Sequence, residues 1–279
     1  MKNTLLIAVL FISSPACCQH YYNDITDARE LGEKMKNLTV QHVRTITAAG
    51  YDSRGIKSTD FNEWQEVDAA GKTLKKTTRN GQQVNRNTYR FDDQFRLVDI
   101  VDSSGDIRSN TKYTYDNRGN IVSIVTTTND SLSDFSQSTA HYYLYDENGK
   151  PLKLWRVING NDSTEFRFKV DPNGNVTDEE LYRRDVALDL TYYYYSDRNL
   201  VTDIVRYDKR TKKLLPVSMF EYDENGRLIQ KMSVLSINRP DYIIWRYIFN
   251  EKGLKTKEAL FNKQKELTGR IEYAYTFEN

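Results

Sequence analysis

Hydrophobic and polar positions alternate in short runs along most of this chain, and a turn interrupts each run. In the clearest example, residues 113–115 read Tyr-Thr-Tyr, which places two aromatic side chains on one face of a strand and the threonine on the other. Asp116 then begins a four-residue turn, where its carboxylate can accept the backbone N–H two residues on. Gly119 occupies the fourth position, which often needs a positive φ. The β-branched residues from 121 to 125 predict a returning strand, so the segment is predicted to form a β-hairpin.

This unit recurs, with substitutions, from about residue 51 onward. From Asp68 the turn positions fall at residues 92, 116, 146, 171, 196, 223 and 250, in steps of 24 to 30 residues, and a period in this range is the signature of a repeat array. A lone hairpin is marginally stable in water, so the units must stack on one another. We expect an all-β fold of about eighteen strands, whose accumulating twist of roughly 20° per strand pair curls one long antiparallel sheet. A short N-terminal helix precedes it.

The signature Tyr-x-Tyr-Asp-x-x-Gly-x-Leu/Ile resembles the YD repeats of the RHS family, and nine related copies cover most of residues 51–279. This resemblance implies a long antiparallel sheet that spirals into a shell. The large RHS toxins carry many more repeats, a core boundary motif and a toxin domain. Because Tyr273 begins a unit that is not completed, the chain is more similar to short secreted YD-repeat proteins, for which the resemblance implies a fold and hardly any activity.

Two turns depart from the pattern. Phe95 and Asn199 stand where the turn glycine is expected. Asparagine tolerates left-handed geometry, whereas phenylalanine does so poorly. We therefore predict a different turn type at residues 92–95.

The N-terminal region divides from the repeats. Residues 1–18 have the features of a signal peptide, with Lys2, an apolar run at 5–12 and small residues before cleavage after Ala16 or Cys18. Lipidation at Cys17 is the alternative, although Ser14 stands where a large aliphatic residue is normal. We expect a secreted, periplasmic or outer-surface protein of a Gram-negative bacterium, with an N-terminal segment at 19–45 and a repeat domain at 46–279.

Helical spacing occurs at residues 24–38. Leu31, Met35 and Leu38 share one helical face, and Asp27 with Glu30 resembles a capping box. This pattern predicts a short helix or a segment that caps the first repeat.

Composition limits the kinds of ligand and active site that the chain can have. Lys+Arg number 40 and Asp+Glu 39, so the chain has no electrostatic footprint for nucleic acid. The repeats contain no cysteine. His42 precedes the array, whereas His141 lies about midway along it, so the two do not suggest a shared site. One aspartate per turn suits hairpin geometry better than a calcium loop. We expect no catalytic residues, no metal, no cofactor and no transmembrane segment.

The second face of the later strands is the best functional candidate. In the C-terminal half it turns apolar, with a proposed ligand or partner surface at Tyr142, Tyr192, Tyr194, Tyr242 and Ile244. Either the sheet curls and buries both faces, or an aromatic strip is exposed for a protein or glycan.

Three functions follow from these patterns. The first is a non-enzymatic envelope scaffold that binds a protein or glycan partner. The second is an immunity or accessory protein of a secreted toxin system, and the third is an unrecognised glycan-active enzyme. Residues 273–277 are also predicted to form a sheet edge, which either self-associates or is covered by a neighbouring loop.

Overall fold

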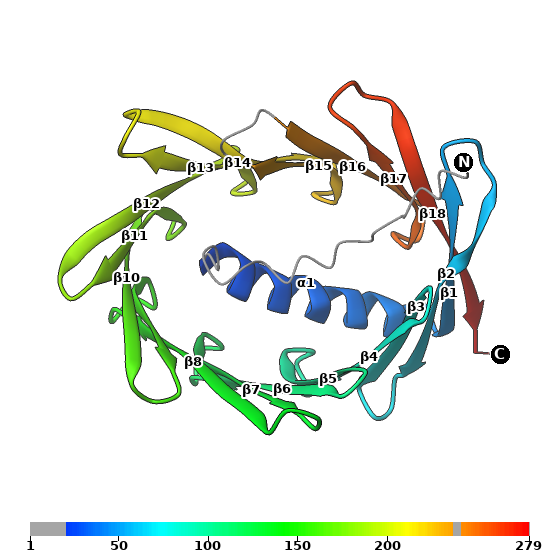
Figure 1. Ribbon diagram of the computed structural model, residues 1–279, viewed down its shortest axis with the longest axis horizontal. Helices are drawn as coiled ribbons and strands as arrows, with labels where there is room; N and C mark the ends of the chain where they lie inside the picture. Colours follow the sequence, from blue (N-terminus) through cyan, green and yellow to red (C-terminus); the bar gives the residue numbers. More distant parts are fainter. Residues whose placement is uncertain (1–20, 237–240, 279) are drawn as a thin grey trace. The chain divides into compact units, whose positions relative to one another are not determined.

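A computed structural model describes residues 21–236 and 241–278. The predicted signal peptide, its expected cleavage positions and Cys17 lie outside the described residues. Within them the chain forms one helix and eighteen strands. Their bounds are α1 Tyr21–Val40, β1 Val43–Asp52, β2 Lys57–Asp68, β3 Thr73–Asn80, β4 Gln83–Phe91, β5 Leu97–Ser104, β6 Ile107–Tyr115, β7 Ile121–Asp130, β8 Phe135–Tyr145, β9 Pro151–Ile158, β10 Asp162–Val170, β11 Val176–Arg183, β12 Val186–Tyr195, β13 Val201–Asp208, β14 Lys213–Tyr222, β15 Leu228–Ser236, β16 Asp241–Phe249, β17 Lys255–Phe261 and β18 Leu267–Phe277 (Figure 1).

The repeat turns have the predicted geometry. At residues 116–120 the Asp116 carboxylate accepts the backbone N–H groups of Arg118 and Asn120, at 2.9 and 2.8 Å. The backbone N–H of Gly119 donates to the Asp116 carbonyl at 3.0 Å, and Gly119 has a φ of 86°. The aspartate thus ties the turn from its first position, which confirms the hairpin interpretation of the unit.

The turn at residues 92–95 corrects a prediction. Phe95 has a φ of 60°, and its N–H donates to the Asp92 carbonyl at 3.0 Å. Asp92 also accepts the N–H groups of Gln94 and Arg96, both at 2.9 Å. The turn type is therefore the same as in the glycine-containing turns, and the different type predicted at Phe95 was wrong. The bonds to Asp92 hold the chain in a left-handed conformation that phenylalanine rarely adopts.

A β-bulge follows most of these turns. In the β8–β9 pair, Tyr145 lies opposite Pro151 and Leu144 opposite Lys153, so Leu152 is an extra residue. Register shifts occur at the matching place after the turns at Asp116, Asp171 and Asp223. One inserted residue moves all later side chains of the strand to the opposite face. The alternation of faces in the strand before the turn therefore does not predict the faces in the strand after it.

Neighbouring repeats are joined by tyrosine hydroxyls. The Tyr145 hydroxyl donates to the Ile121 carbonyl at 2.8 Å, and the Tyr195 hydroxyl to the Val176 carbonyl at 2.7 Å. In each case the acceptor lies five positions beyond the start of the preceding repeat's turn. Arg198 adds bonds from its own turn to the carbonyls of the next, at 2.8 Å. The second tyrosine of the repeat signature therefore links one hairpin to the one before it.

The sheet is closed, which corrects the expected open, curled sheet. All eighteen strands belong to one hydrogen-bonded sheet, in which β1 pairs antiparallel with both β2 and β18. By its hydrogen-bond connectivity it is a β-barrel. The predicted edge at residues 273–277 is paired with β1, with Tyr273 opposite Ala48. Neither edge self-association nor a covering loop is needed, since β1 satisfies the backbone groups of β18.

The chain divides into two compact units, which are described separately. Unit 1 comprises the described residues up to 97, together with 102–105 and those from 247 onward; unit 2 comprises residues 98–101 and 106–246. In unit 1, α1 packs against one face of the sheet, where Met35 and Leu38 are buried. The helix is longer than predicted. Because it begins at Tyr21, Asp27 and Glu30 lie inside it and do not form the capping box. No helix within the described residues combines the length and apolar character that a membrane span needs.

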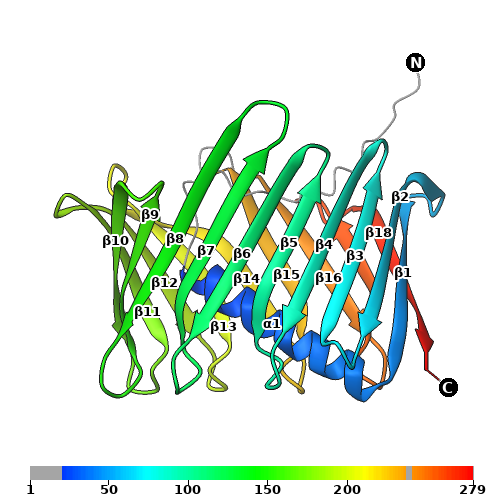
Figure 2. The ribbon, with the colours of Figure 1, turned by 90° about the horizontal axis from the view of Figure 1, so that it is seen from below.

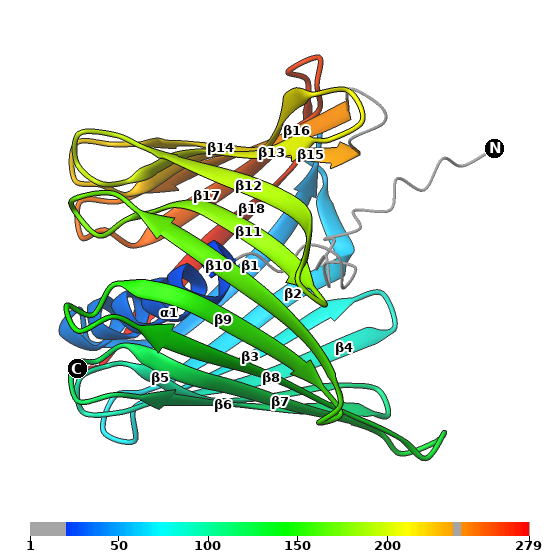
Figure 3. The ribbon, with the colours of Figure 1, turned by 90° about the vertical axis from the view of Figure 1, so that its left-hand side faces the viewer.

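Unit 2 buries the aromatic face of its repeats. Phe166, Tyr193 and Phe220 are each under a tenth exposed. So are Leu154, which lies opposite Phe166, and Ile204, which lies opposite Tyr193. Figure 3 shows β8 to β12 of this unit side by side, and Figure 2 shows the hairpins of the unit following one another. The side chains on the other face of these strands are more exposed than those on the aromatic face.

We predict that Tyr195→Phe lowers the free energy of unfolding by about 1 kcal/mol, because it removes the hydroxyl and leaves the Val176 carbonyl without that donor. The adjacent Tyr194 is 46% exposed, so Tyr194→Phe is the matched control and should change stability by less than about 0.5 kcal/mol. Urea unfolding measures both. Equal effects of the two variants would show that the hydroxyl link contributes nothing.

Candidate functional site

The five residues proposed from the sequence do not form one surface. Tyr142 and Tyr194 are each 46% exposed, Tyr192 and Tyr242 are half-buried, and Ile244 is buried. Ile244 is therefore not part of an accessible site. Tyr142 on β8 is separated by three strands from Tyr192 and Tyr194 on β12. Whatever joins the two ends must come from β9, β10 and β11.

Strand register places further aromatic residues between them. Tyr142 lies opposite Trp155, Trp155 opposite Glu165, and Glu165 opposite Tyr182. Residues directly opposite in adjacent strands share a face, so these four form one row across β8 to β11. A parallel row runs from Leu144 through Lys153, Arg167 and Glu180. We call this surface the β8–β11 patch and define it by Tyr142, Trp155, Glu165, Arg167 and Tyr182.

The charged residues of the patch hold its aromatic rings in place. The carbon at the centre of the Arg167 guanidinium lies 3.8 Å from the ring centroid of Tyr182, a cation–π contact. The same guanidinium donates through Nε to Glu165 Oε1 at 2.5 Å. Lys153 Nζ lies 3.1 Å from that carboxylate and 5.8 Å from the Trp155 ring centroid. Trp155 and Tyr182 are thus fixed by a network centred on Glu165.

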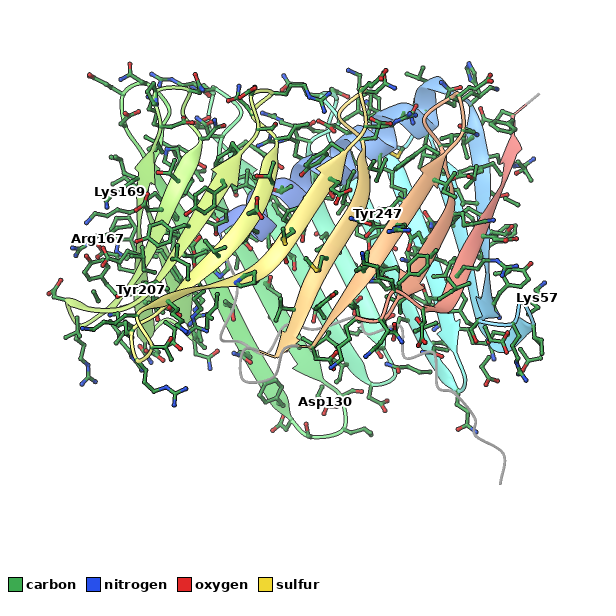
Figure 4. All side chains as sticks on the ribbon, turned by 90° about the horizontal axis from the view of Figure 1, so that it is seen from above. Lys57, Asp130, Arg167, Lys169, Tyr207 and Tyr247 are labelled. Carbon is green, nitrogen blue, oxygen red and sulfur yellow. The ribbon has the colours of Figure 1, made fainter. Side chains whose placement is uncertain are left out.

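The electrostatics of the patch follow from these contacts. The hydrogen bond from Arg167, supported by Lys153, holds the pKa of Glu165 below its ordinary value despite partial burial. The Tyr182 hydroxyl donates to Glu180 Oε2 at 2.7 Å, and that bond raises the pKa of the tyrosine. The Trp155 and Tyr182 rings therefore each have a charged side chain beside them. Arg167 and Lys169 extend away from the ribbon of β10 (Figure 4).

Sequence reasoning missed Trp155 and Tyr182. Simple alternation from the buried Pro151 assigns Lys153 and Trp155 to the buried face, but Leu152 is an extra residue at the bulge. Leu154 is consequently buried, and Trp155 lies on the exposed face of the sheet, in the same row as Tyr142. The signal that could have found Trp155 is the bulge itself, one residue after the Pro151 that follows the turn.

A second group of charged and polar residues, of the kinds found in active sites, lies beneath α1 in unit 1. Lys34 Nζ donates to Gln65 Oε1 at 2.9 Å, and Gln65 Nε2 donates to Glu63 Oε1 at 2.5 Å. The other oxygen of Glu63 accepts from Thr78 Oγ1 at 3.1 Å and lies 2.8 Å from Lys76 Nζ. Glu63, Gln65 and Thr78 are all buried. We call these five residues the Lys34 cluster.

Charge compensation keeps Glu63 ionised. Burial alone would raise the pKa of Glu63, but the charge and hydrogen bond of Lys76, with Lys34 and Gln65, outweigh burial and hold that pKa below its ordinary value. Lys34 behaves in the opposite way. Burial, with repulsion from Lys76 and Lys255, lowers the pKa of the Lys34 ammonium to about 8. The cluster thus contains one firmly charged ion pair and one lysine that loses its proton within reach of neutral pH.

A second carboxylate borders the cluster. Glu258 accepts the Tyr273 hydroxyl at 2.9 Å and forms an ion pair with Lys255. Lys255 Nζ lies 5.3 and 5.4 Å from the ring centroids of Tyr247 and Tyr273. Burial, together with the charge of Glu258, raises the pKa of both tyrosines. Both hydroxyls therefore stay protonated at neutral pH, and that of Tyr273 donates to Glu258.

The arrangement is that of an anchor for the helix. A partly buried lysine with a shifted pKa is a candidate catalytic group, yet Lys34 donates to Gln65 under α1. Asn37 on the same helix donates to the Gly253 carbonyl at 3.3 Å. Within the described residues no group of three or more His, Cys, Asp or Glu could hold a metal ion. The sequence signal for this anchor was Lys34 itself, which lies at the helical positions of the buried Met35 and Leu38 face.

Comparisons with known proteins identify no family. No protein-family model and no curated protein sequence matches the chain. A porin-like protein from Bacteroides uniformis is similar in structure over 84% of this chain and 98% of that one, with 9% identity and a TM-score of 0.38. A porin-like protein from Bacteroides vulgatus matches over 84% and 99%, with 13% identity and a TM-score of 0.27. TcdB2-TccC3-Cdc42 matches over 77% of this chain and 16% of that one, with 12% identity and a TM-score of 0.30. Similarity this low carries no functional argument, and the resemblance to YD repeats stays a prediction.

We predict that the pH dependence of stability reports the Lys34 anchor. Between pH 8 and about 10.5 the unfolded chain keeps a proton that folded Lys34 has released, so rising pH stabilises the fold in this window. Below pH 8 the cost of the buried charge is fully present. Lys34→Met removes this dependence. The free energy of unfolding of the natural chain minus that of Lys34→Met should rise by up to about 3 kcal/mol from pH 7 to 10.5.

Tyrosine titration affects both proteins and cancels in the difference. Lys36, two residues away, is exposed, so the same difference taken with Lys36→Met should be flat. Urea unfolding at several pH values measures both curves. A flat curve for Lys34→Met would contradict the anchor.

Proposed function

We propose that this chain is a non-enzymatic scaffold of the bacterial envelope, which binds a partner protein through the β8–β11 patch. One observation supports this proposal most directly. Tyr142, Trp155 and Tyr182 lie in one row on the exposed face of the sheet, beside Arg167. Tyrosine, tryptophan and arginine are the residues that dominate binding energy at protein interfaces. The remaining exposed aromatic candidates, Tyr192 and Tyr194, extend this surface onto β12.

Contacts within the patch hold its side chains in place before a partner binds. Arg167 already contacts Glu165 and Tyr182, so its side chain loses less conformational freedom when a partner covers it. The rings of Tyr142 and Trp155 lie beside each other in register and offer apolar area without a flexible side chain. Lys169 and Asp178, with Nζ and Oδ1 3.3 Å apart, add a charged pair at one side of the patch, beyond Arg167. An aromatic centre with a polar rim is the usual anatomy of a protein interface.

The envelope location rests on the predicted signal peptide, and the absence of catalysis rests on the lack of any catalytic pattern in the sequence. An immunity or accessory role in a toxin system is one form of protein binding, and the partner's identity would establish it. A glycan partner or a glycan-active site would use the same aromatic surface differently, without a protein adduct.

A photo-crosslinking amino acid at position 155 tests the proposal in the producing cell. We expect one discrete protein adduct, identified by mass spectrometry, because position 155 lies at the centre of the patch. The matched control carries the same amino acid at Leu132, an exposed position in the turn between β7 and β8 of the same unit, and should give no such adduct. With the purified partner, Arg167→Ala should weaken binding about tenfold or more.

Folding of the variants is checked by thermal unfolding. The proposal is wrong if position 155 gives no adduct, or if the adducts at positions 155 and 132 are the same. It is also wrong if Arg167→Ala, folded as the natural chain, binds the partner with unchanged affinity.

A further inference from the structure

A groove lies on the opposite face of the unit 1 sheet from α1. It has a volume of about 670 Å³, and its lining includes Arg44, Thr45, Trp64, Glu66, Lys75 and Phe277. Trp64 and Glu66 alternate along β2 with Glu63 and Gln65, which lie beneath α1, so they point to the other side. The groove is therefore separate from the Lys34 cluster, and all its residues belong to unit 1.

The strand sequences explain why a hollow forms there. On this face β1 carries small residues, with Thr45 opposite Thr276 on β18 and opposite Glu66 on β2. The hydroxyls of Thr45 and Thr276 lie 2.6 Å apart and join the two strands. Trp64 on β2 and Phe277 on β18 both line the groove, and each is 44% exposed. Two large aromatic side chains thus border a floor of threonines.

The lining presents hydrogen-bonding groups beside the rings. Trp64 Nε1 donates to Glu66 Oε1 at 3.1 Å, which fixes the indole. Lys252 Nζ lies 5.0 Å from the ring centroid of Phe277 and restrains the other ring. Arg44 and Lys75 supply donors, and Glu66 together with Asp68 supplies acceptors. These are two positive and two negative charges, so the lining is formally neutral.

We propose that this groove binds a short neutral oligosaccharide. A sugar ring has an apolar face of C–H groups, which suits the faces of Trp64 and Phe277, and a rim of hydroxyls, which suits the surrounding donors and acceptors. The volume lies within the range of about 300–1,000 Å³ typical of small-molecule sites. The balanced charge gives no advantage to a nucleotide or a polyanion. This site is independent of the β8–β11 patch, from which it differs in every residue.

Tryptophan fluorescence offers a direct test. The chain has three tryptophans, and Trp155→Phe with Trp245→Phe leaves Trp64 as the single reporter. The probes are maltotriose, cellotriose and chitotriose, with trigalacturonate as the charged comparison. We expect at least one neutral trisaccharide to change Trp64 emission in a saturable way, with a Kd between about 10 µM and 1 mM, and trigalacturonate to bind more weakly.

Variants then locate the binding by calorimetry with the trisaccharide that binds. Trp64→Ala should weaken it at least about tenfold, and Thr45→Trp, which fills the floor of the groove, should abolish it. Trp155→Ala, in the β8–β11 patch, should leave it unchanged. The inference is overturned if no neutral trisaccharide binds at 10 mM ligand, or if binding persists in folded Thr45→Trp and Trp64→Ala.

Discussion

The structure depends on the pairing of its first strand with its last. An array of hairpins has two end strands, and each would expose a row of unpaired backbone groups. Here β1 lies antiparallel to β18 from Val43 opposite Phe277 to Asp52 opposite Gly269. One strand pair therefore satisfies both ends of the array. The seam is also packed, because Ala48, Phe61 and Ile271 form a buried cluster against which Tyr273 lies.

Closure determines where binding can take place. A sheet without a free edge cannot accept an added strand from a partner, so recognition must use side chains on its faces. In unit 2 one face is occupied by the buried aromatic residues and by the hydroxyl links between repeats. In unit 1 one face is covered by α1 and fixed by the Lys34 cluster. In unit 2 the opposite face carries the β8–β11 patch. In unit 1 the opposite face carries the groove that Trp64 lines.

The local structure could be predicted from the sequence, because each hairpin is specified by neighbouring residues. The aspartate that ties the turn and the glycine with positive φ are both visible in residues 116–119. The expected number of strands is also confirmed within the described residues. Phe95 was mispredicted because its own preference is outweighed by the hydrogen bonds to Asp92. A local rule failed where the surrounding bonds were stronger than the preference of one residue.

The remaining features are non-local, and this is why the sequence did not show them. Nothing near Tyr273 indicates that Ala48 lies opposite it. The bulge at Leu152 moved Trp155 to the exposed-face row, so the candidate site was only partly found. Ile244 was proposed for that site by alternation along β16 but is buried. Lys34 was overlooked because its partners, Gln65 and Glu63, come from a strand beyond the helix.

Cysteine crosslinking across the seam tests closure most directly. Thr47 on β1 lies opposite Ala274 on β18, so cysteines at these two positions should form an intramolecular disulfide in a chain whose Cys17 and Cys18 are serine. Cysteines at Thr47 and Arg270 are four residues out of register and should not. Non-reducing electrophoresis of the monomer measures both. The account predicts a crosslinked monomer for the first pair alone. Free thiols in that pair, or a disulfide that joins two chains, would contradict it.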